Sequence, residues 1–281
     1  MALSINTNTG ALNAAAAASS VNKAMEISME RLATGKRINA AADDAAGAAI
    51  VSRLNSEIRG TNQSIRNAMD AQALIDTAEG ASVEIENILQ RMRELAVQSA
   101  TGTVNSSDRT NLNTEYSQLV NEVNRIAGVT KWAGNTLLAS ASSTTFTFQI
   151  GHATGSTDRV TVSISGLGSL YIGSTTSVGS TTIAGSAGAA RSAIGVLDAA
   201  ITDVNTVRAK LGAYSNRMDH TVNNLTNITT NLQSGVGRIE DADFAAESSA
   251  LAKTQILQQA STAMLAQANA SKQSVLSLLQ S

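Results

Sequence analysis

The stretch IGVLDAAITDVNTVRAKLGAYSNRMDHTVNNLTNITTNLQSGVGRI, residues 194–239, carries an apolar side chain at every seventh position. This column consists of Leu197, Val204, Leu211, Met218, Leu225, Leu232 and Ile239. An unbroken heptad column predicts one long helix that packs along another helix. The alternate column is mixed, because it includes Arg208, Ser215 and Thr229 beside apolar residues. The two columns together predict firm packing on the chain's own helices and looser packing on something else.

A second long helix is predicted between Ala45 and about Ala100, where no strong helix breaker occurs. At about 1.5 Å per residue, this segment would form a rod of roughly 80 Å. Its apolar residues recur at helical spacing, at Val51, Leu54, Ile58, Ile65, Ile85, Ile88, Met92 and Leu95. After a turn, Ser107 or Asp108 is predicted to cap a third helix that ends near Gly128. The seam of that helix consists of Leu112, Tyr116, Leu119, Val123 and Ile126.

The composition favours extended helices over a compact core. The chain has 281 residues, no proline and only 2% aromatic residues, whereas a compact core normally recruits aromatic side chains because they bury the most area. The lack of proline removes the strongest helix breaker. The formal net charge of -2 argues against nucleic acid as the main partner. Without cysteine, neither disulfides nor thiolate chemistry can contribute.

The composition changes from about residue 136 to residue 190, where serine, threonine and glycine dominate. Apolar residues alternate there with polar ones on both sides of a glycine-containing loop, at Phe146, Phe148 and Ile150 and at Val160, Val162 and Ile164. This alternation predicts a β-hairpin. The remainder, GSTTSVGSTTIAGSAG at residues 173–188, is predicted to be an exposed loop.

Both ends of the chain are alanine-rich helical candidates that bury little apolar area on their own and should be mobile in a monomer. The segment MALSINTNTGALNAAAAASS lacks the basic start of a cleavable signal peptide. The terminal SVLSLLQ is too short to cross a bilayer, which needs about 20 apolar residues. We therefore expect no membrane insertion, and export, if it occurs, by another route.

The stretch RLATGKRINAAADDAAG, residues 31–47, has features of three enzyme sites. A phosphate-binding loop would need glycine where Glu30 stands and serine or threonine where Arg37 stands. Asp43 and Asp44 are helix neighbours that point about 100° apart, so they do not form a carboxylate pair. A metal site would need histidine or cysteine nearby. We therefore expect that Gly35 ends one helix and that the two acids lie near the start of the next.

No other cluster predicts catalysis, a cofactor or a metal. His152 is assigned to the hairpin loop and His220 to a helix rim, in unrelated settings. RIEDADFAAE, residues 238–247, lacks the alternating oxygen ligands and the glycine of a calcium loop. It is predicted to be a helix junction in which Phe244 is docked and Arg238 pairs with Asp241 or Asp243. Trp132 is expected to pack at the end of the third helix.

Several segments together resemble bacterial flagellin in the order that the family shows. They are ERLATGKRINAAADDAAGAAI (30–50), LQRMRELAVQSA (89–100), NRIAG, GNTLL, FQIG, RIEDADFAAE and QILQQASTAMLAQAN (255–269). The resemblance covers residues 1–138 and 189–281. It implies a mainly α fold, in which the N- and C-terminal arms form a long antiparallel helical coiled-coil rod with a small central β-hairpin and loop region.

The resemblance also implies a structural subunit that self-assembles into the tubular filament of the flagellum for swimming motility. Five segments follow from it. They are an inner-tube helix and spoke (1–45), N-terminal rod helices (46–138), a short outward hairpin and loop (139–188), a C-terminal rod helix (189–237) and a returning spoke with an inner-tube helix (238–281). The middle segment is much shorter than in flagellins that carry extra outer domains. Its serines and threonines are candidate O-glycosylation acceptors.

By the resemblance, three groups of residues carry function. Polymerisation by the inner-tube helices is assigned to Leu3, Ile5, Leu12, Leu257, Met264, Leu265, Val275, Leu278 and Leu279. The spoke is assigned to Arg31, Lys36, Arg37, Ile38, Asp43, Asp44, Arg238, Glu240, Asp241, Asp243 and Phe244. Contact with neighbouring subunits, or with the animal innate immune receptor for flagellin, is assigned to Leu89, Gln90, Arg91, Glu94, Leu95, Gln98 and Glu115.

The partners that the resemblance implies are further copies of the chain, a flagellar export chaperone, and the hook-filament junction and filament cap proteins. The expected location is extracellular, after export through the flagellar secretion apparatus without signal-peptide cleavage. In the filament, Arg208, Ser215 and Thr229 are expected to face neighbouring rods and to allow sliding between two packing registers. A junction protein that caps growth, a secreted coiled-coil adhesin and a hydrolase insert are the alternatives.

Overall fold

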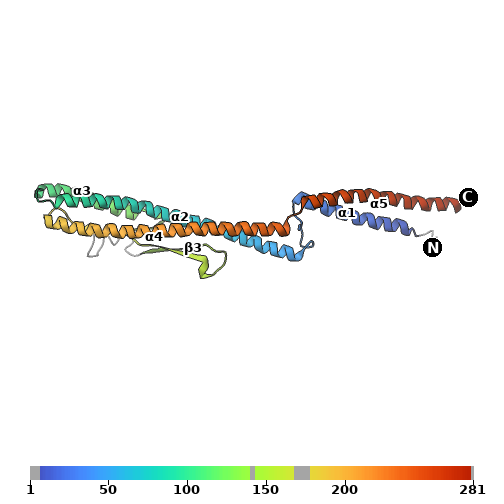
Figure 1. The fold of residues 1–281 in the computed structure, drawn as a ribbon, viewed down its shortest axis with the longest axis horizontal. Helices are drawn as coiled ribbons and strands as arrows, with labels where there is room; N and C mark the ends of the chain where they lie inside the picture. Colours follow the sequence, from blue (N-terminus) through green and yellow to red (C-terminus); the bar gives the residue numbers. More distant parts are fainter. Residues whose placement is uncertain (1–6, 140–142, 168–177, 280–281) are drawn as a thin grey trace. The chain divides into compact units, whose positions relative to one another are not determined.

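The computed structural model describes residues 7–139, 143–167 and 178–279. The chain forms two compact units, one from residues 1–58 and 230–281 and the other from residues 59–229. Five long helices dominate the described residues, so the predicted mainly α fold is confirmed (Figure 1). They are α1 (Thr9–Thr34), α2 (Ala45–Ser99), α3 (Ser106–Val129), α4 (Ala187–Glu240) and α5 (Phe244–Leu279). Within the described ranges, no helix is sufficiently long and apolar to cross a membrane.

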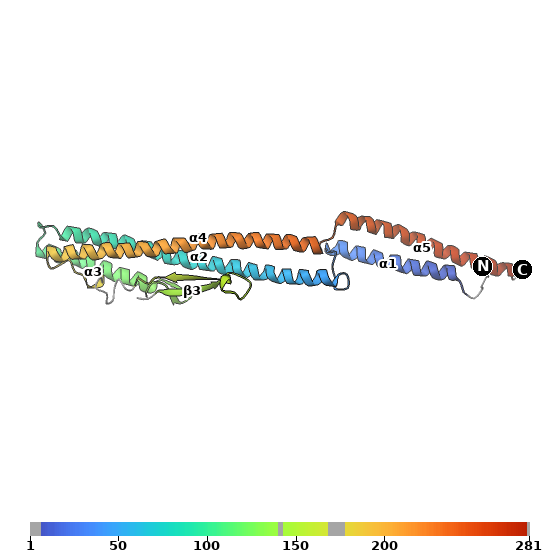
Figure 2. The ribbon, with the colours of Figure 1, turned by 60° about the horizontal axis from the view of Figure 1, so that its bottom comes forward.

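In the first unit, α1 and α5 run antiparallel along one another (Figures 1 and 2). Asn8 at the start of α1 donates a side-chain hydrogen bond to the carbonyl oxygen of Ala268 at 3.2 Å, and Arg31 near its end lies 3.8 Å from Glu247. The covered positions of α1 follow a 3-4 spacing, at Ala11, Ala14, Ala18, Val21, Met25, Ser28 and Leu32. Those of α5 do the same, at Glu247, Leu251, Thr254, Gln258, Ser261, Leu265 and Ala268. We call these two rows the terminal seam.

In the second unit, α2, α3 and α4 pack along one another around one apolar core. The strict column of α4 supplies Leu197, Val204, Leu211 and Met218 to this core, all at most 1% exposed. The helix α2 contributes Ile85, Leu89, Met92 and Leu95, and α3 contributes Tyr116 and Val123. The prediction of a long helix from Ala45 is confirmed, since α2 has 55 residues. The predicted cap of α3 is wrong, because the side chain of Asn105 accepts the hydrogen bond from the backbone nitrogen of Asp108.

Two of the three polar residues expected to face neighbouring rods, Arg208 and Thr229, make hydrogen bonds within the chain, while Ser215 is half-buried on α4. Arg208 donates hydrogen bonds to Glu79, at 3.1 Å, and to Glu86, both on α2 of the same chain. Thr229 is only 7% exposed, and its hydroxyl donates to the carbonyl oxygen of Leu225. Acids and a carbonyl oxygen within the chain therefore satisfy the polar groups of Arg208 and Thr229.

The predicted hairpin is confirmed as β3 (Thr144–Gln149) paired antiparallel with β4 (Arg159–Ile164). Phe146 lies opposite Val162 and Phe148 opposite Val160, and this apolar face packs against the core. A second, short hairpin joins β1 (Lys131–Trp132) to β2 (Asn135–Thr136) and was not predicted. Its turn places Ala133 at φ 47° and Gly134 at φ 86°. Trp132 packs partly against the core, as expected.

The prediction of an exposed loop at residues 173–188 is wrong at Val178 and Ile183, which are buried, while several residues around them are exposed and residues 173–177 lie outside the described residues. Val178 opens a short 3-10 helix, η3 (Val178–Ser180), and is 1% exposed, and Ile183 is fully buried. Ser99 donates to the carbonyl oxygen of Ile183 at 2.7 Å, and Asn113 accepts from its nitrogen at 3.0 Å. These polar side chains of α2 and α3 hold the segment on the core.

Candidate functional site

Large apolar side chains remain exposed on the terminal helices, outside the terminal seam. On α5, Ile256 is 67% exposed, Met264 64% and Leu257 41%. On α1, Leu12 is 62% exposed. Isolated exposed apolar residues are ordinary on a protein surface, but a row of them on one helix marks an interaction site. We call Ile256, Leu257 and Met264, with Ala260 and Ala263 between them on the same side of α5, the α5 apolar row.

The predicted polymerisation residues fall into three groups. Leu12, Leu257 and Met264 are exposed. Leu265 is half-buried in the terminal seam, beside Ala15 and Ala18 of α1, so its contacts lie within the chain. The others lie outside the described residues or side chains, at Leu3, Ile5, Val275, Leu278 and Leu279. Ile256 was missed, although it lies one position before Leu257 in a quoted family segment.

The segment between α1 and α2 lies beside the segment between α4 and α5. The backbone nitrogen of Arg37 donates to the carbonyl oxygen of Glu240 at 2.6 Å, and the nitrogen of Ala242 donates to the carbonyl oxygen of Gly35 at 3.0 Å. Lys36 and Asp241 form an isolated antiparallel bridge. We call this pair of segments the junction. It ties the start of α2 and the end of α4 to the terminal helices by backbone contacts.

Charged side chains reinforce the junction. The ammonium group of Lys36 lies 2.7 Å from the carboxylate of Glu240, and this hydrogen-bonded pair raises the pKa of Lys36. The guanidinium of Arg37 donates to the carbonyl oxygen of Ile239 at 2.7 Å. Ile38 is the apolar anchor of the segment, since it is only 7% exposed.

The two aspartates accept backbone hydrogen bonds at the start of α2 and in the turn before it. Gly35, at φ 70°, ends α1 in the left-handed conformation, as predicted. Asp44 accepts a hydrogen bond from the backbone nitrogen of Gly47 at 2.9 Å and so caps the start of α2. Asp43 accepts from the nitrogens of Ala40 and Asn39, at 3.0 and 3.1 Å. These two hydrogen bonds lower the pKa of the Asp43 carboxyl.

Two predictions about residues 238–247 are wrong. Phe244 is 68% exposed and therefore not docked on its own chain. Arg238 forms no ion pair with Asp241 or Asp243 among the described residues. Asp243 instead accepts hydrogen bonds from the backbone nitrogens of Ala245 and Ala246, and thus caps α5. Among the described residues, the aromatic side chain of Phe244 is thus mostly uncovered at the start of a capped helix.

The third predicted group lies on α2 and α3 and divides by burial. Leu89 is fully buried and Leu95 is 1% exposed, so neither is accessible to a partner while the unit is folded. Gln90, Arg91, Glu94, Gln98 and Glu115 are exposed. Arg91 donates to Glu115 at 2.8 Å and to Glu94 at 3.0 Å, and these hydrogen bonds raise the pKa of its guanidinium. The exposed polar residues therefore form one surface, with the two leucines beneath it.

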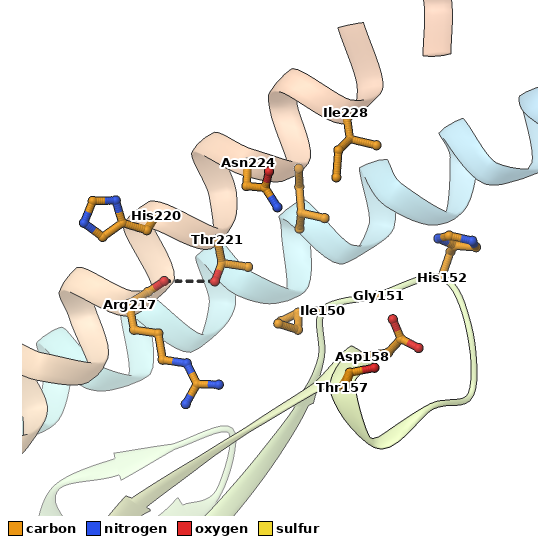
Figure 3. Close-up of a pocket in the computed structure, with 11 residues that line it drawn as sticks. Ile150, Gly151, His152, Thr157, Asp158, Arg217, His220, Thr221, Asn224 and Ile228 are labelled. Carbon is orange, nitrogen blue, oxygen red and sulfur yellow. Dashed lines mark hydrogen bonds between the residues drawn. The ribbon is translucent and has the colours of Figure 1, made fainter. Parts of the chain in front are cut away.

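Both histidines line one open pocket of 460 Å³ in the second unit, contrary to the prediction of unrelated settings. Figure 3 shows His220 of α4 and His152 of the hairpin loop on opposite sides of this pocket, with Ile150 between them. Gly60 of α2 lets the hairpin loop approach, because a Cβ there would lie 2.9 Å from the Cβ of His152. Among the described residues, no group of three or more histidine, cysteine or acidic side chains is arranged to hold a metal.

Comparison with known proteins identifies relatives over nearly the whole chain. The model of the bacterial flagellin N-terminal helical region matches residues 5–143, and that of the C-terminal helical region matches residues 194–279. A flagellin of Halalkalibacterium halodurans is 42% identical over 89% of this chain and 90% of its own length. A flagellin of Bacillus subtilis is 40% identical over 98% of this chain and 99% of its own length. The crystal structure of Bacillus cereus flagellin, at 34% identity, covers 61% of this chain and 94% of its own, with a TM-score of 0.48.

Proposed function

The chain belongs to the bacterial flagellin family, and from this premise we propose that the α1–α5 pair joins copies of the chain into a flagellar filament. Flagellins are structural proteins and not enzymes, and they form the extracellular flagellar filament by self-assembly. This chain is a short member with a reduced outer region. The open question is which residues make the contacts between copies.

The α5 apolar row is the observation that carries the proposal. The terminal seam already uses one side of α1 and one side of α5, and it holds many small or polar residues, such as Thr254, Gln258 and Ser261. The exposed side chains of Ile256 and Met264 add nothing to that pair. Burial of a large aliphatic side chain contributes about 1.5 to 3 kcal/mol. A second copy that covers this row would supply the apolar contacts that the isolated pair lacks.

The junction is proposed to act as the spoke that carries each α1–α5 pair at the end of the rod helices. Its backbone pairing and the Lys36–Glu240 ion pair favour a defined arrangement within the segment. Phe244 is proposed to dock on a neighbouring copy, because it is 68% exposed in the isolated chain. The segments proposed for these roles are 1–45 and 238–281 for inner-tube helices and spokes, 46–138 and 189–237 for the rod, and 139–188 for the outward part.

Further partners are proposed from family membership. An export chaperone would bind the chain before assembly, and hook-filament junction and filament cap proteins would contact the two ends of the growing polymer. Export through the flagellar apparatus without signal-peptide cleavage belongs to the same proposal. The exposed surface around Arg91 and Glu115 is proposed to contact neighbouring copies and to be the part that the animal flagellin receptor reads.

Removal of residues 262–281 tests the assembly role. The shortened chain is expected to keep the helicity of α2, α3 and α4 and to stay monomeric when short filament fragments are added. Sedimentation and circular dichroism measure the two properties on the same sample. Filaments from the shortened chain would refute the assignment of assembly to the terminal pair. If the intact chain binds to the fragments and stops their growth, it would instead be a junction protein.

A further inference from the structure

The contact between α2 and α4 contains a row of polar side chains in a fixed order. On α2 these residues are spaced by seven, so they lie on one side of the helix. We call the whole set the charge column. It consists of Gln72, Glu79, Glu86 and Arg93 on α2 and of Asp219, Arg208 and Asp198 on α4.

Arg208 is the centre of the charge column. Its Nε lies 3.1 Å from a carboxylate oxygen of Glu79, and its Nη1 contacts a carboxylate oxygen of Glu86. The guanidinium is about one third exposed and Glu86 is 15% exposed, so part of the charge is withdrawn from water. One cation thus bridges two acids that are one heptad apart on the partner helix.

At both ends of the column the acid lies on α4, whereas at its centre the acids lie on α2. Nearer the start of α2, the amide of Gln72 donates to the carboxylate of Asp219. Nearer its end, Nε of Arg93 lies 2.5 Å from a carboxylate oxygen of Asp198. On α4 the order is therefore acid, base, acid, and on α2 it is amide, acid, acid, base. On α2 only the acid repeats after seven residues, at Glu79 and Glu86, while Gln72 before them and Arg93 after them differ.

The apolar seam beside the column does repeat after seven residues. On α4 it reads Leu197, Val204, Leu211 and Met218, and on α2 it includes Ala71, Ala78, Ile85 and Met92. A shift of one heptad, about 10 Å along the axis, would again place apolar side chains opposite apolar side chains. The seam alone therefore discriminates poorly between these alignments.

The charge column strongly favours the observed alignment of α4 on α2 over alignments shifted by one heptad. A shift in one direction would place Arg208 between Glu86 and Arg93, and Asp219 beside Glu79. A shift in the other direction would place Asp198 beside Glu86. Each shift breaks existing pairs and brings like charges together, which is unfavourable between neighbouring helices.

We propose that the charge column sets the axial register of α4 against α2 by excluding alignments shifted by one heptad. This role concerns one chain and does not depend on polymerisation, so it is tested on the monomer. It also gives Arg208, one of the polar residues of the mixed column, a function within the chain.

The natural lack of cysteine makes the register measurable. Gln72→Cys with Asp219→Cys reports the observed register, because these side chains are in contact. Ile65→Cys with Asp219→Cys reports the shifted one, because Ile65 lies one heptad before Gln72. Each pair is oxidised in the full-length monomer, and the disulfides are identified by peptide mass spectrometry. With Arg208 present, only the first pair is expected to close.

Arg208→Glu is expected to raise the yield of the shifted disulfide about tenfold, because two ion pairs become two repulsions. Glu79→Lys and Glu86→Lys added to Arg208→Glu should restore the observed register. Arg217→Glu, the same change at an exposed site of α4, is the matched control and should leave the ratio unchanged. If Arg208→Glu lowers helicity, Glu79→Gln with Glu86→Gln replaces it, with the same expectation. Equal disulfide ratios in the Arg208 and Arg217 variants, or failure of the triple variant to restore the ratio, would overturn the proposal.

Discussion

The ammonium group of Lys36 lies 2.7 Å from the carboxylate of Glu240, although the two residues are more than 200 positions apart in the chain. Beside this ion pair, the backbones of the two junction segments form hydrogen bonds. The junction therefore has structure of its own, and it need not act as a loose tether between helices. Gly35, where α1 ends, adopts a left-handed backbone conformation at φ 70°.

Gly35→Ala should destabilise the unit formed by residues 1–58 and 230–281 by about 1 kcal/mol, since a left-handed backbone is unfavourable for alanine. No atom lies within 4 Å of a Cβ added at Gly35, so the effect arises from the backbone alone. Gly235→Ala, inside α4 and equally free of close atoms, is the control, and it should stabilise the chain by about 0.5 to 1 kcal/mol. Thermal unfolding followed by circular dichroism measures both. Equal effects of the two substitutions would contradict this reading of Gly35.

The turn before α2 should lose stability only under acidic conditions. Hydrogen bonds from the backbone nitrogens of Ala40 and Asn39 lower the pKa of Asp43 below its ordinary value, which is about 3.9. A group with a depressed folded pKa contributes stability above its unfolded pKa and loses it as the pH falls through the folded one. The amide proton signals of residues 39 and 40 should therefore shift only below about pH 4. Asp43→Asn should abolish this shift, and a transition above the ordinary carboxyl pKa would count against it.

Ile256→Ser combined with Met264→Ser should raise the concentration needed for filament growth by at least about tenfold, because each loses about 1.5 to 3 kcal/mol of burial. Both positions lie outside the terminal seam, so the helicity of the monomer should change little. Gln255→Ser with Gln259→Ser, at exposed polar positions of the same helix, is the matched control. Pelleting assays over a range of concentrations give the comparison. Identical critical concentrations for the two double variants would remove the α5 apolar row from the interface.

Arg91→Ala should weaken receptor signalling by the soluble monomer, whereas Arg93→Ala should not. The two arginines are similarly exposed, at 51% and 46%, and each belongs to an ion pair. Arg91 lies with Glu94 and Glu115 on the proposed contact surface, while Arg93 pairs with Asp198 of α4. Receptor signalling is measured in reporter cells treated with equal doses of both variants. Equal signalling by the two variants would show that the receptor does not contact the surface around Arg91.

Most of the fold follows from local patterns in the sequence. The 55 residues of α2 contain no proline, and their apolar positions keep one spacing throughout, so both the helix and its length could be predicted. The left-handed end at Gly35 and the hairpin of β3 and β4 likewise depend on neighbouring residues.

Features of the fold that depend on contacts between residues far apart in the chain could not be predicted. Ile183 is surrounded by serine, threonine and glycine in the sequence, and its burial depends on Ser99 and Asn113, more than 60 positions away. Phe244 was expected to dock on its own chain but is exposed. The sequence alone does not show whether an aromatic side chain packs within its own chain or remains on the surface. Among the residues assigned to receptor contact by resemblance to the family, Leu89 lies in the core and is not accessible.

Seeded growth of the intact chain measures whether copies of it assemble through the α5 apolar row. Purified full-length protein is added to short filament fragments and examined by electron microscopy, with an unseeded sample sedimented beside it. Long tubes of uniform width are expected to extend from the fragments, and the Ile256 and Met264 double variant should fail to extend them at the same concentration. Fragments that never lengthen with the intact chain, or tubes that grow equally well from the double variant, would contradict assembly through this row.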